Sequence, residues 1–406
     1  MKDRLVRTRG NNPGTLVTFN AWLVAIMLCI NSLAVITPIN GIVVVGCFIC
    51  FLFLLFFNSK RIGSKLYIKS YLVVLVTIVA FALDIFFNKE EIIKEYFYSF
   101  LCFGMPFLFL PFADVNYRNV IRNVCYLGVL FLPFYVLNVL NIGMMDVTHY
   151  NDDSLNTMTM SYRLLPYICA SIFLLLEGDT KKKIVALMVG VPYSIIFFVI
   201  GSRGAIVAAL LLPLLYYFNG NGISHGRITR RRVILIALVL VVAVSFNGII
   251  DWLYSATQQR DVDILAVNRI WDKLYGTGGD MDSGRSLIIK ESFRKISESP
   301  IIGNGIASSL NYKGYPHNVF VQILEEGGIV VFLPFLYLFI RSIATIIGSK
   351  YRTDYFVVLV FVFCAGVVQL FFSANYWSSQ YFWTFIFLVL YEKELLKRDQ
   401  YVVKKV

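Results

Sequence analysis

Three short motifs carry side chains that could do chemistry, and the first is an arginine in a tight turn. The turn is Gly201-Ser202-Arg203-Gly204, and it joins apolar stretches at about 184–201 and 205–218. A guanidinium donates two parallel hydrogen bonds to a phosphate, so an arginine fixed in such a turn is suited to hold a phosphorylated ligand. An arginine that only reaches toward lipid headgroups would have the same sequence signature. Position alone leaves both interpretations of Arg203 open.

The second motif begins at Gly284-Arg285, directly after Asp282-Ser283, a pair able to cap a helix. Apolar residues then recur at helical spacing among charged ones, at Ile289, Phe293 and Ile296. This pattern predicts an amphipathic helix that lies on the bilayer or on the spans beneath it. It ends at Ser299-Pro300, and Gly303-Asn304-Gly305 is a turn signal. On these residues alone, Arg285 is a solvated charge.

The third motif runs from Pro316 to Gly328. Asn318, Gln322 and Glu325 fall at i, i+4 and i+7, so they share one helical stripe. The paired Gly327-Gly328 is predicted to break or bend the helix before the next apolar stretch. His317 at the start of this helix could act as a general base near neutral pH. A helix-capping or packing histidine is the alternative.

Membrane spans must position these residues, because the composition excludes a soluble fold. Of the 406 residues 58% are apolar or aromatic and 15% are charged, against about 25% charged in soluble domains. An ordinary cytosolic enzyme, a disordered tail and a secreted disulfide scaffold are thereby excluded. Stretches long enough to cross a bilayer lie at about 17–38, 41–57, 69–87, 95–113, 120–141, 163–177, 184–201, 205–218, 233–250, 328–346, 355–374 and 379–391.

The distribution of Lys and Arg predicts the orientation of the spans. Basic residues gather in alternate segments, whereas the short intervening loops carry only Lys89, Lys94, Arg163 and Arg203. By the positive-inside rule, both termini are cytoplasmic and the long loop at about 251–316 is outside. The net charge of +12 is then a topology signal, and we expect no nucleic-acid partner.

Few charged residues lie deep within the predicted spans. Asp84 is the clearest case, and it falls near the outer end of its span. Ion-coupled transporters need carboxylates near the bilayer midplane. This distribution, together with the lack of a repeat between the two halves, disfavours a transporter or flippase.

In order, spacing and side, the three motifs resemble those of the O-antigen polymerase and O-antigen ligase superfamily. The matching elements are Ser202-Arg203-Gly204, then Gly284-Arg285 through Pro300 and Gly303-Asn304-Gly305, then His317-Asn318. Glu326 and Gly328 follow His317 at nine and eleven positions. Val331 stands where the family often has a further glycine, which is a minor departure.

The resemblance implies an all-α polytopic membrane protein of about 12 transmembrane helices, GT-C-like, with one large periplasmic loop containing short helices. It implies a glycosyltransferase at the periplasmic face of the bacterial inner membrane. The donor is a sugar chain on undecaprenyl diphosphate, the acceptor is a hydroxyl, and no metal or other cofactor is needed. The partners implied are lipid-linked O-antigen repeat units, membrane lipid and a chain-length regulator protein.

The resemblance also suggests residue roles. Arg203 and Arg285 would hold the diphosphate, with Arg163 as a third candidate at the outer start of its span. His317 would be the base, with Asn318 and Glu326 in substrate binding or positioning. The Pro316-His317-Asn318 context favours a polymerase, while a ligase that transfers the polymer to lipid A–core shares the motifs.

The predicted organisation has three parts. Residues 1–250 form a membrane domain with spans one to nine. Residues 251–327 form the periplasmic loop with the catalytic helices. Residues 328–406 hold spans ten to twelve and a cytoplasmic tail.

Overall fold

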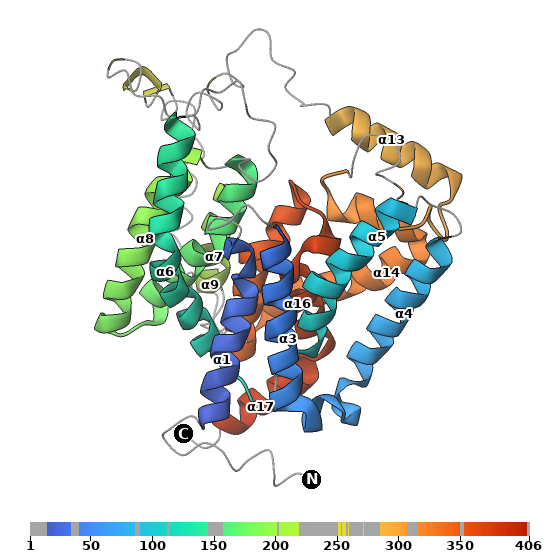
Figure 1. The fold of residues 1–406 in the computed structure, drawn as a ribbon, viewed down its shortest axis with the longest axis horizontal. Coiled ribbons are helices and arrows are strands. Elements are labelled where there is room, and N and C mark those ends of the chain that lie inside the picture. The colour runs from blue at the N-terminus through green and yellow to red at the C-terminus, as the bar shows by residue number, and fades with distance from the viewer. Residues whose placement is uncertain are drawn as a thin grey trace.

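The computed structural model describes a helical protein. It describes residues 14–33, 40–85, 90–111, 114–144, 157–200, 203–218, 251–252, 254–256, 259, 271, 285–306, 308, 316–349 and 353–403. Within these ranges every regular element is a helix (Figure 1). Each predicted span lies on a helix except 233–250, which falls outside the described residues, as does the predicted cap Asp282-Ser283.

The first half of the chain supplies helices that follow one another closely. Their bounds are α1 Thr15–Leu28, η2 Ile30–Ser32, α3 Asn40–Ile62, η3 Lys65–Tyr67, α4 Ile68–Asp84, α5 Glu90–Ser99, η4 Phe100–Gly104, η5 Met105–Phe109, α6 Tyr117–Met144, α7 Thr157–Glu177, α8 Thr180–Ile200 and α9 Arg203–Phe218. In the second half they are α13 Arg285–Glu298, α14 Val319–Gly348, α15 Asp354–Val362, η9 Phe363–Val367, η10 Val368–Phe371, η11 Tyr376–Ser378, α16 Gln380–Leu390 and α17 Glu392–Val403.

Six helical segments of the described residues are long and apolar enough to cross a membrane, namely Ile42–Ile62, Lys65–Asp84, Tyr117–Val139, Thr159–Glu177, Val319–Gly348 and Asp354–Phe371. They differ in burial. In the apolar stretch of Asp354–Phe371, 83% of the residues are buried, against 17% in that of Lys65–Asp84. Apolar side chains of α4 such as Leu72 and Leu75 are more than half exposed. Such a surface is stable only where lipid covers it, so the chain is a multi-pass membrane protein.

Two helical stretches change geometry along their length. The stretch that begins with α5 becomes a π-helix at Phe100–Gly104, and the stretch that begins with α15 becomes one at Phe363–Val367. Both changes coincide with close packing at a glycine. A Cβ on Gly104 would lie 3.1 Å from the Trp383 side chain of α16, and one on Gly366 would be closer still to Tyr381 of the same helix. The central helices therefore approach more closely than larger residues would allow.

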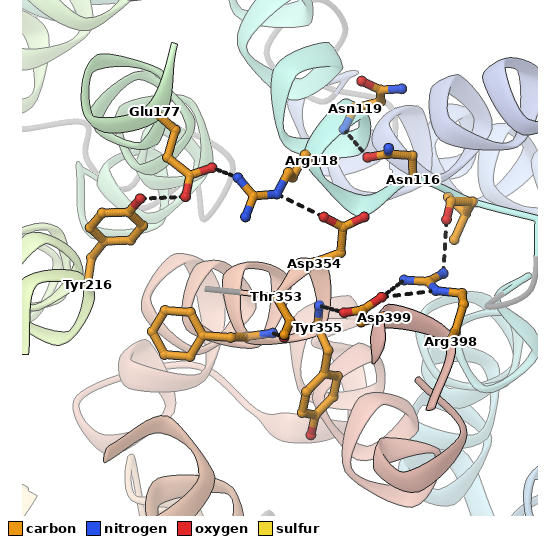
Figure 2. A network of polar contacts seen from close by, with 12 residues as sticks. Asn116, Arg118, Asn119, Glu177, Tyr216, Thr353, Asp354, Tyr355, Arg398 and Asp399 are labelled. Carbon is orange, nitrogen blue, oxygen red and sulfur yellow. Dashed lines mark hydrogen bonds and ion pairs between the residues drawn. The ribbon is translucent and has the colours of Figure 1, made fainter. Parts of the chain in front are cut away.

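Ion pairs join several helix ends at one end of the bundle, here called the α17 end (Figure 2). Arg118 at the start of α6 contacts Glu177 at the end of α7 and donates to Asp354 at 2.8 Å. Tyr216 near the end of α9 donates to the other oxygen of Glu177. These bonds tie α6, α7, α9 and α15 together.

The C-terminal helix joins the same network. Asp399 of α17 accepts from the backbone N–H of Tyr355 at 2.8 Å and from Arg398. Arg398 also donates to the backbone oxygen of Val115 at 3.0 Å. At this end each of these carboxylates contacts an arginine.

Candidate functional site

The site is built around a break in α14. Gly328 has φ 59° and ψ −166°, so the helix stops there and resumes in a new direction. The predicted break at Gly327-Gly328 is confirmed, and it coincides with the predicted boundary between the outer loop and span ten. Only glycine adopts this part of φ/ψ space readily.

The turn at Pro300–Gly305 forms hydrogen bonds to the backbone groups that the break in α14 leaves without a helical partner. In an unbroken helix the N–H of Ile329 and Val330 would donate to the carbonyls of Glu325 and Glu326. Here these N–H groups donate instead to the oxygens of Pro300 at 3.0 Å and Ile301 at 3.1 Å. All four groups of the missing helical bonds are thereby satisfied, because the two carbonyls accept from the turn as well.

The Gly303-Asn304-Gly305 motif makes this exchange possible. The N–H of Asn304 donates to Glu325 O at 2.8 Å, and that of Gly305 donates to Glu326 O at 3.0 Å. Gly303 has φ 78°, and a Cβ there would lie 2.3 Å from Glu326 O. A Cβ on Gly328 would lie 2.3 Å from Ile301 O. Gly303 and Gly328 thus allow the backbone of the turn to contact the backbone of α14 directly.

The predicted amphipathic helix is confirmed as α13, and the same turn ties it to α14. The amide nitrogen of Asn304 donates to Lys295 O at 2.8 Å, which satisfies a carbonyl in the last turn of α13. Arg294 bonds both Glu291 and Glu298 on the exposed face, and its hydrogen bonds hold the pKa of Glu291 below its usual range. Ser292 is fully buried, whereas Phe293 is 55% exposed. Phe293 therefore lies on the exposed side of the helix.

Glu326 lies buried directly before the break, held by neutral donors. Its Oε2 accepts from Tyr376 Oη at 2.6 Å and from Trp377 Nε1 at 2.9 Å, and its Oε1 accepts from Gln322 Nε2 at 2.9 Å. Gln322 also donates to Asn375 Oδ1 at 3.0 Å. The carboxylate therefore joins the short first part of α14 to the connection before α16.

Asn375, Tyr376 and Trp377 were not predicted from the sequence as site residues. The signal that could have found them is a polar and aromatic Asn-Tyr-Trp run between the last two apolar stretches. Such a run is unusual in a chain of apolar spans. Tyr376 and Trp377 bond Glu326, and Asn375 bonds Gln322. The cluster of Gln322, Glu326, Asn375, Tyr376 and Trp377 is named the Glu326 cluster below.

His317 and Asn318 begin α14. Asn318 Oδ1 accepts from the N–H groups of Phe320 at 3.0 Å and Val321 at 3.3 Å, so Asn318 is the N-cap. Its amide nitrogen is the part of the side chain that a substrate could use. His317 is half-buried and has φ 53°, a left-handed backbone that is uncommon for a residue other than glycine. Nine positions separate it from Glu326, about 13 Å along a helix axis, so Glu326 does not orient His317 directly.

Arg203 and Arg285 are the first residues of α9 and α13. Their side chains lie outside what the structure describes, but their backbone places each at a helix N-terminus. The free N–H groups there favour anions, as a guanidinium does. Next to Arg203, a Cβ on Gly204 would lie 2.5 Å from Tyr162 Oη, so the start of α9 packs against the start of α7.

Arg163 lies one residue beyond Tyr162 and lines a cavity of about 270 Å³. Tyr162 and Asn375 line the same cavity. The structure therefore brings Arg163, the start of α9 and the Glu326 cluster to one place. Arg285 begins α13, which the turn at Pro300–Gly305 ties to α14, and His317 directly precedes the N-cap of α14. Both therefore belong to elements that are joined to the Glu326 cluster.

These residues lie away from the α17 end. Arg163 precedes Glu177 by fourteen residues in α7, about 21 Å, and Arg203 precedes Tyr216 by thirteen in α9, about 20 Å. The second part of α14 returns to the α17 end, where Arg341 pairs with Glu392. Figure 1 shows α13 at the top of the view and α17 at the bottom. The end with α13 is called the α13 end.

Comparison with known proteins relates part of the chain to a described family. A family model described as O-antigen ligase matches residues 184–336, which is less than half of the chain. Searches of curated proteins and of solved structures found no match. The matched region runs from α8 into α14, and it includes Arg203, Arg285, His317, Asn318 and Glu326. Over this region the chain is similar to the O-antigen ligase family.

Proposed function

We propose that the protein is an O-antigen polymerase, a glycosyltransferase that joins undecaprenyl-diphosphate-linked oligosaccharide repeat units. The family match over residues 184–336 carries this proposal. The proposed setting is the periplasmic face of the bacterial inner membrane, with cytoplasmic termini and about 12 spans in a GT-C-like arrangement. The Pro316-His317-Asn318 context favours the polymerase within the superfamily.

The reaction joins an acceptor hydroxyl to the anomeric carbon of the donor. In this mechanism His317 accepts the proton of the acceptor hydroxyl while the hydroxyl oxygen forms the new bond to the anomeric carbon. The bond from the carbon to the diphosphate oxygen breaks, and undecaprenyl diphosphate leaves with the electron pair. The start of α14, where Asn318 caps the helix, holds His317 in a defined backbone conformation.

Arginines supply the electrostatic part of the mechanism. Charge grows on the diphosphate as the bond breaks, and fixed cations stabilise it in the transition state. Arg203 and Arg285 each begin a helix, so guanidinium and backbone N–H groups act on the same anion. Arg163 is the third cation, in the wall of the cavity.

Deletion and complementation test this function. In the strain of origin, deletion should leave lipopolysaccharide with core plus a single repeat unit, and the wild-type gene should restore the ladder. Arg203→Ala, Arg285→Ala and His317→Ala should each fail to restore it although the protein is present in the membrane. Arg294→Ala is the matched control, since the described partners of this exposed arginine, Glu291 and Glu298, lie on its own helix α13. A ladder from all three site variants would overturn the site.

The ligase is the second candidate, because the matched family model carries that description. The same deletion separates the two. Loss of a ligase leaves bare lipid A–core, and finished polymer accumulates on the lipid carrier. That result would replace the polymerase proposal and leave the site assignment standing.

The proposed chemistry is metal-independent, since arginines provide the charge stabilisation. Chain formation by the purified protein should therefore persist in EDTA. Activity that vanished in EDTA and returned with Mg²⁺ would contradict this part of the mechanism.

A further inference from the structure

The cavity beside Arg163 has a composition that the diphosphate alone does not explain. Most of its lining side chains are amides and hydroxyls, among them Asn31, Ser32, Gln369 and Asn375. Arg163 is the one charged residue among the described residues that line it, and none of these is an acid. The wall therefore suits a neutral, hydrogen-bonding ligand joined to a single anionic group.

Hydrogen bonds within the protein fix which way the wall presents its donors and acceptors. Asn375 Oδ1 accepts from Gln322 Nε2 and from the N–H of Trp377, both at 3.0 Å, so its amide nitrogen is left to donate. Asn31 Nδ2 donates to Gln380 Oε1 at 2.9 Å, so its carbonyl oxygen is left to accept.

A third group, at Ser32, is fixed in the same way. Its Oγ accepts from Tyr135 at 3.1 Å and from Tyr167 at 2.6 Å, which leaves its own hydrogen to donate. The wall thus offers donors and an acceptor in set positions. A phosphate only accepts hydrogen bonds, whereas a sugar hydroxyl both donates and accepts. Asn31 therefore favours a sugar over a second phosphate.

The backbone supports a functional role for this wall. Of the non-glycine residues that the structure describes, only His317 and Ala374 have a positive φ, and Ala374 at 72° lines the cavity. Such strain persists where the surroundings impose it, and it concentrates at functional sites. The two outliers lie at the proposed base and in the wall next to Asn375.

The size of the cavity limits the ligand. Its volume of about 270 Å³ is below the roughly 300–1,000 Å³ of pockets that enclose drug-sized ligands. One sugar ring fits this space, and a whole repeat unit does not.

We propose that the cavity binds the sugar ring nearest the diphosphate of the lipid-linked donor, with Arg163 on the adjoining phosphate. Asn375 and Ser32 donate to ring hydroxyls and Asn31 accepts from one. This subsite rests on the proposed function, and it would set which first sugar the protein accepts. Because Asn375 also bonds Gln322 of the Glu326 cluster, the ring contacts the wall that holds the kinked helix.

A binding comparison with two probes tests the subsite. The purified full-length protein in lipid nanodiscs is titrated with undecaprenyl diphosphate, and separately with the lipid-linked repeat unit that accumulates in the deletion strain. Asn31→Ala should weaken binding of the repeat unit about five- to tenfold, the loss of one hydrogen bond to a hydroxyl, and leave undecaprenyl diphosphate unchanged. Gln369→Ala should do the same, and this side chain carries no described hydrogen bond whose loss would disturb the fold.

Two further variants serve as references. Arg163→Ala should weaken both probes. Asn138→Ala should weaken neither, because this asparagine bonds Phe134 O within α6 and is not among the described residues that line the cavity.

The outcomes separate the subsite from the proposed function. If Asn31→Ala and Gln369→Ala weaken both probes equally, or neither, the sugar subsite is wrong while the proposed function stands. If the wild-type protein binds neither probe, the proposed function fails and the subsite with it.

Discussion

A tyrosine donates to a glutamate at both ends of the helical bundle, but the surroundings of the two glutamates differ: Glu326 is buried, whereas Glu177 is partly buried. At the α17 end Tyr216 donates to Glu177, whose other oxygen contacts Arg118. At the α13 end Tyr376 donates to Glu326, whose described partners are all neutral. A carboxylate paired with an arginine fastens one helix to another, whereas Glu326 has no cation among its described partners to compensate a charge.

The two ends also differ in backbone. The described ion pairs of the α17 end join whole helices at their termini (Figure 2). At the α13 end the helix itself is broken, and a turn supplies the missing backbone partners. We conclude that the α17 end holds the bundle together, while the α13 end is shaped for a ligand. The following substitutions test this contrast, from the largest expected effect to the smallest.

Gly328→Ala should have the largest effect. The added Cβ would lie 2.3 Å from Ile301 O, on a residue with φ 59°, so the turn must separate from α14 and four backbone bonds are lost. We expect no lipopolysaccharide ladder and a sharply lower melting temperature of the purified protein. Gly348→Ala is the matched control in the same helix, since nothing lies within 4 Å of its Cβ. A functional Gly328→Ala variant would show that the kink is not needed.

Glu326→Gln should rank second. A glutamine side chain has one accepting oxygen, and its NH₂ group would face one of the three donors of the Glu326 cluster. A buried donor left without an acceptor costs about 1–3 kcal/mol, and the connection before α16 would shift. We expect chain formation per molecule of inserted protein to fall more than tenfold. Glu298→Gln on the exposed face of α13 is the control and should retain full activity.

The sequence predicted most of this architecture because its signals are local. A span needs only a run of apolar residues, and the break at Gly327-Gly328 needs only two adjacent glycines. Two of the partners of Glu326 were beyond such reasoning, since Tyr376 and Trp377 lie 50 and 51 positions away from it. The exchange of backbone bonds between Pro300–Gly305 and α14 also has no local signature, although the glycines that permit it were singled out. The span at 233–250 and the roles of Arg203, Arg285 and His317 remain predictions.

Asp354→Asn tests the opposite end and should rank third. It removes one of the two carboxylates that contact Arg118, while Glu177 remains. Arg118 is 35% exposed, so solvent screens part of the loss, and we expect about 1–2 kcal/mol less stability. Activity per inserted molecule should be unchanged. If it fell as far as for Glu326→Gln, the two ends would not differ in the way proposed.

The smallest and sharpest test compares Tyr216→Phe with Tyr376→Phe. Each removes one hydroxyl that donates to a glutamate, and each costs about 0.5–1.5 kcal/mol of stability at most. Their stabilities should therefore be similar, as thermal melting of the purified variants would show. Their activities should differ: Tyr216→Phe leaves chain formation intact because Arg118 still holds Glu177, whereas Tyr376→Phe lowers it several-fold because Glu326 loses one of three neutral donors. Equal activities in the two variants would mean that Glu326, like Glu177, only fastens helices, and that the α13 end owes its function to other residues.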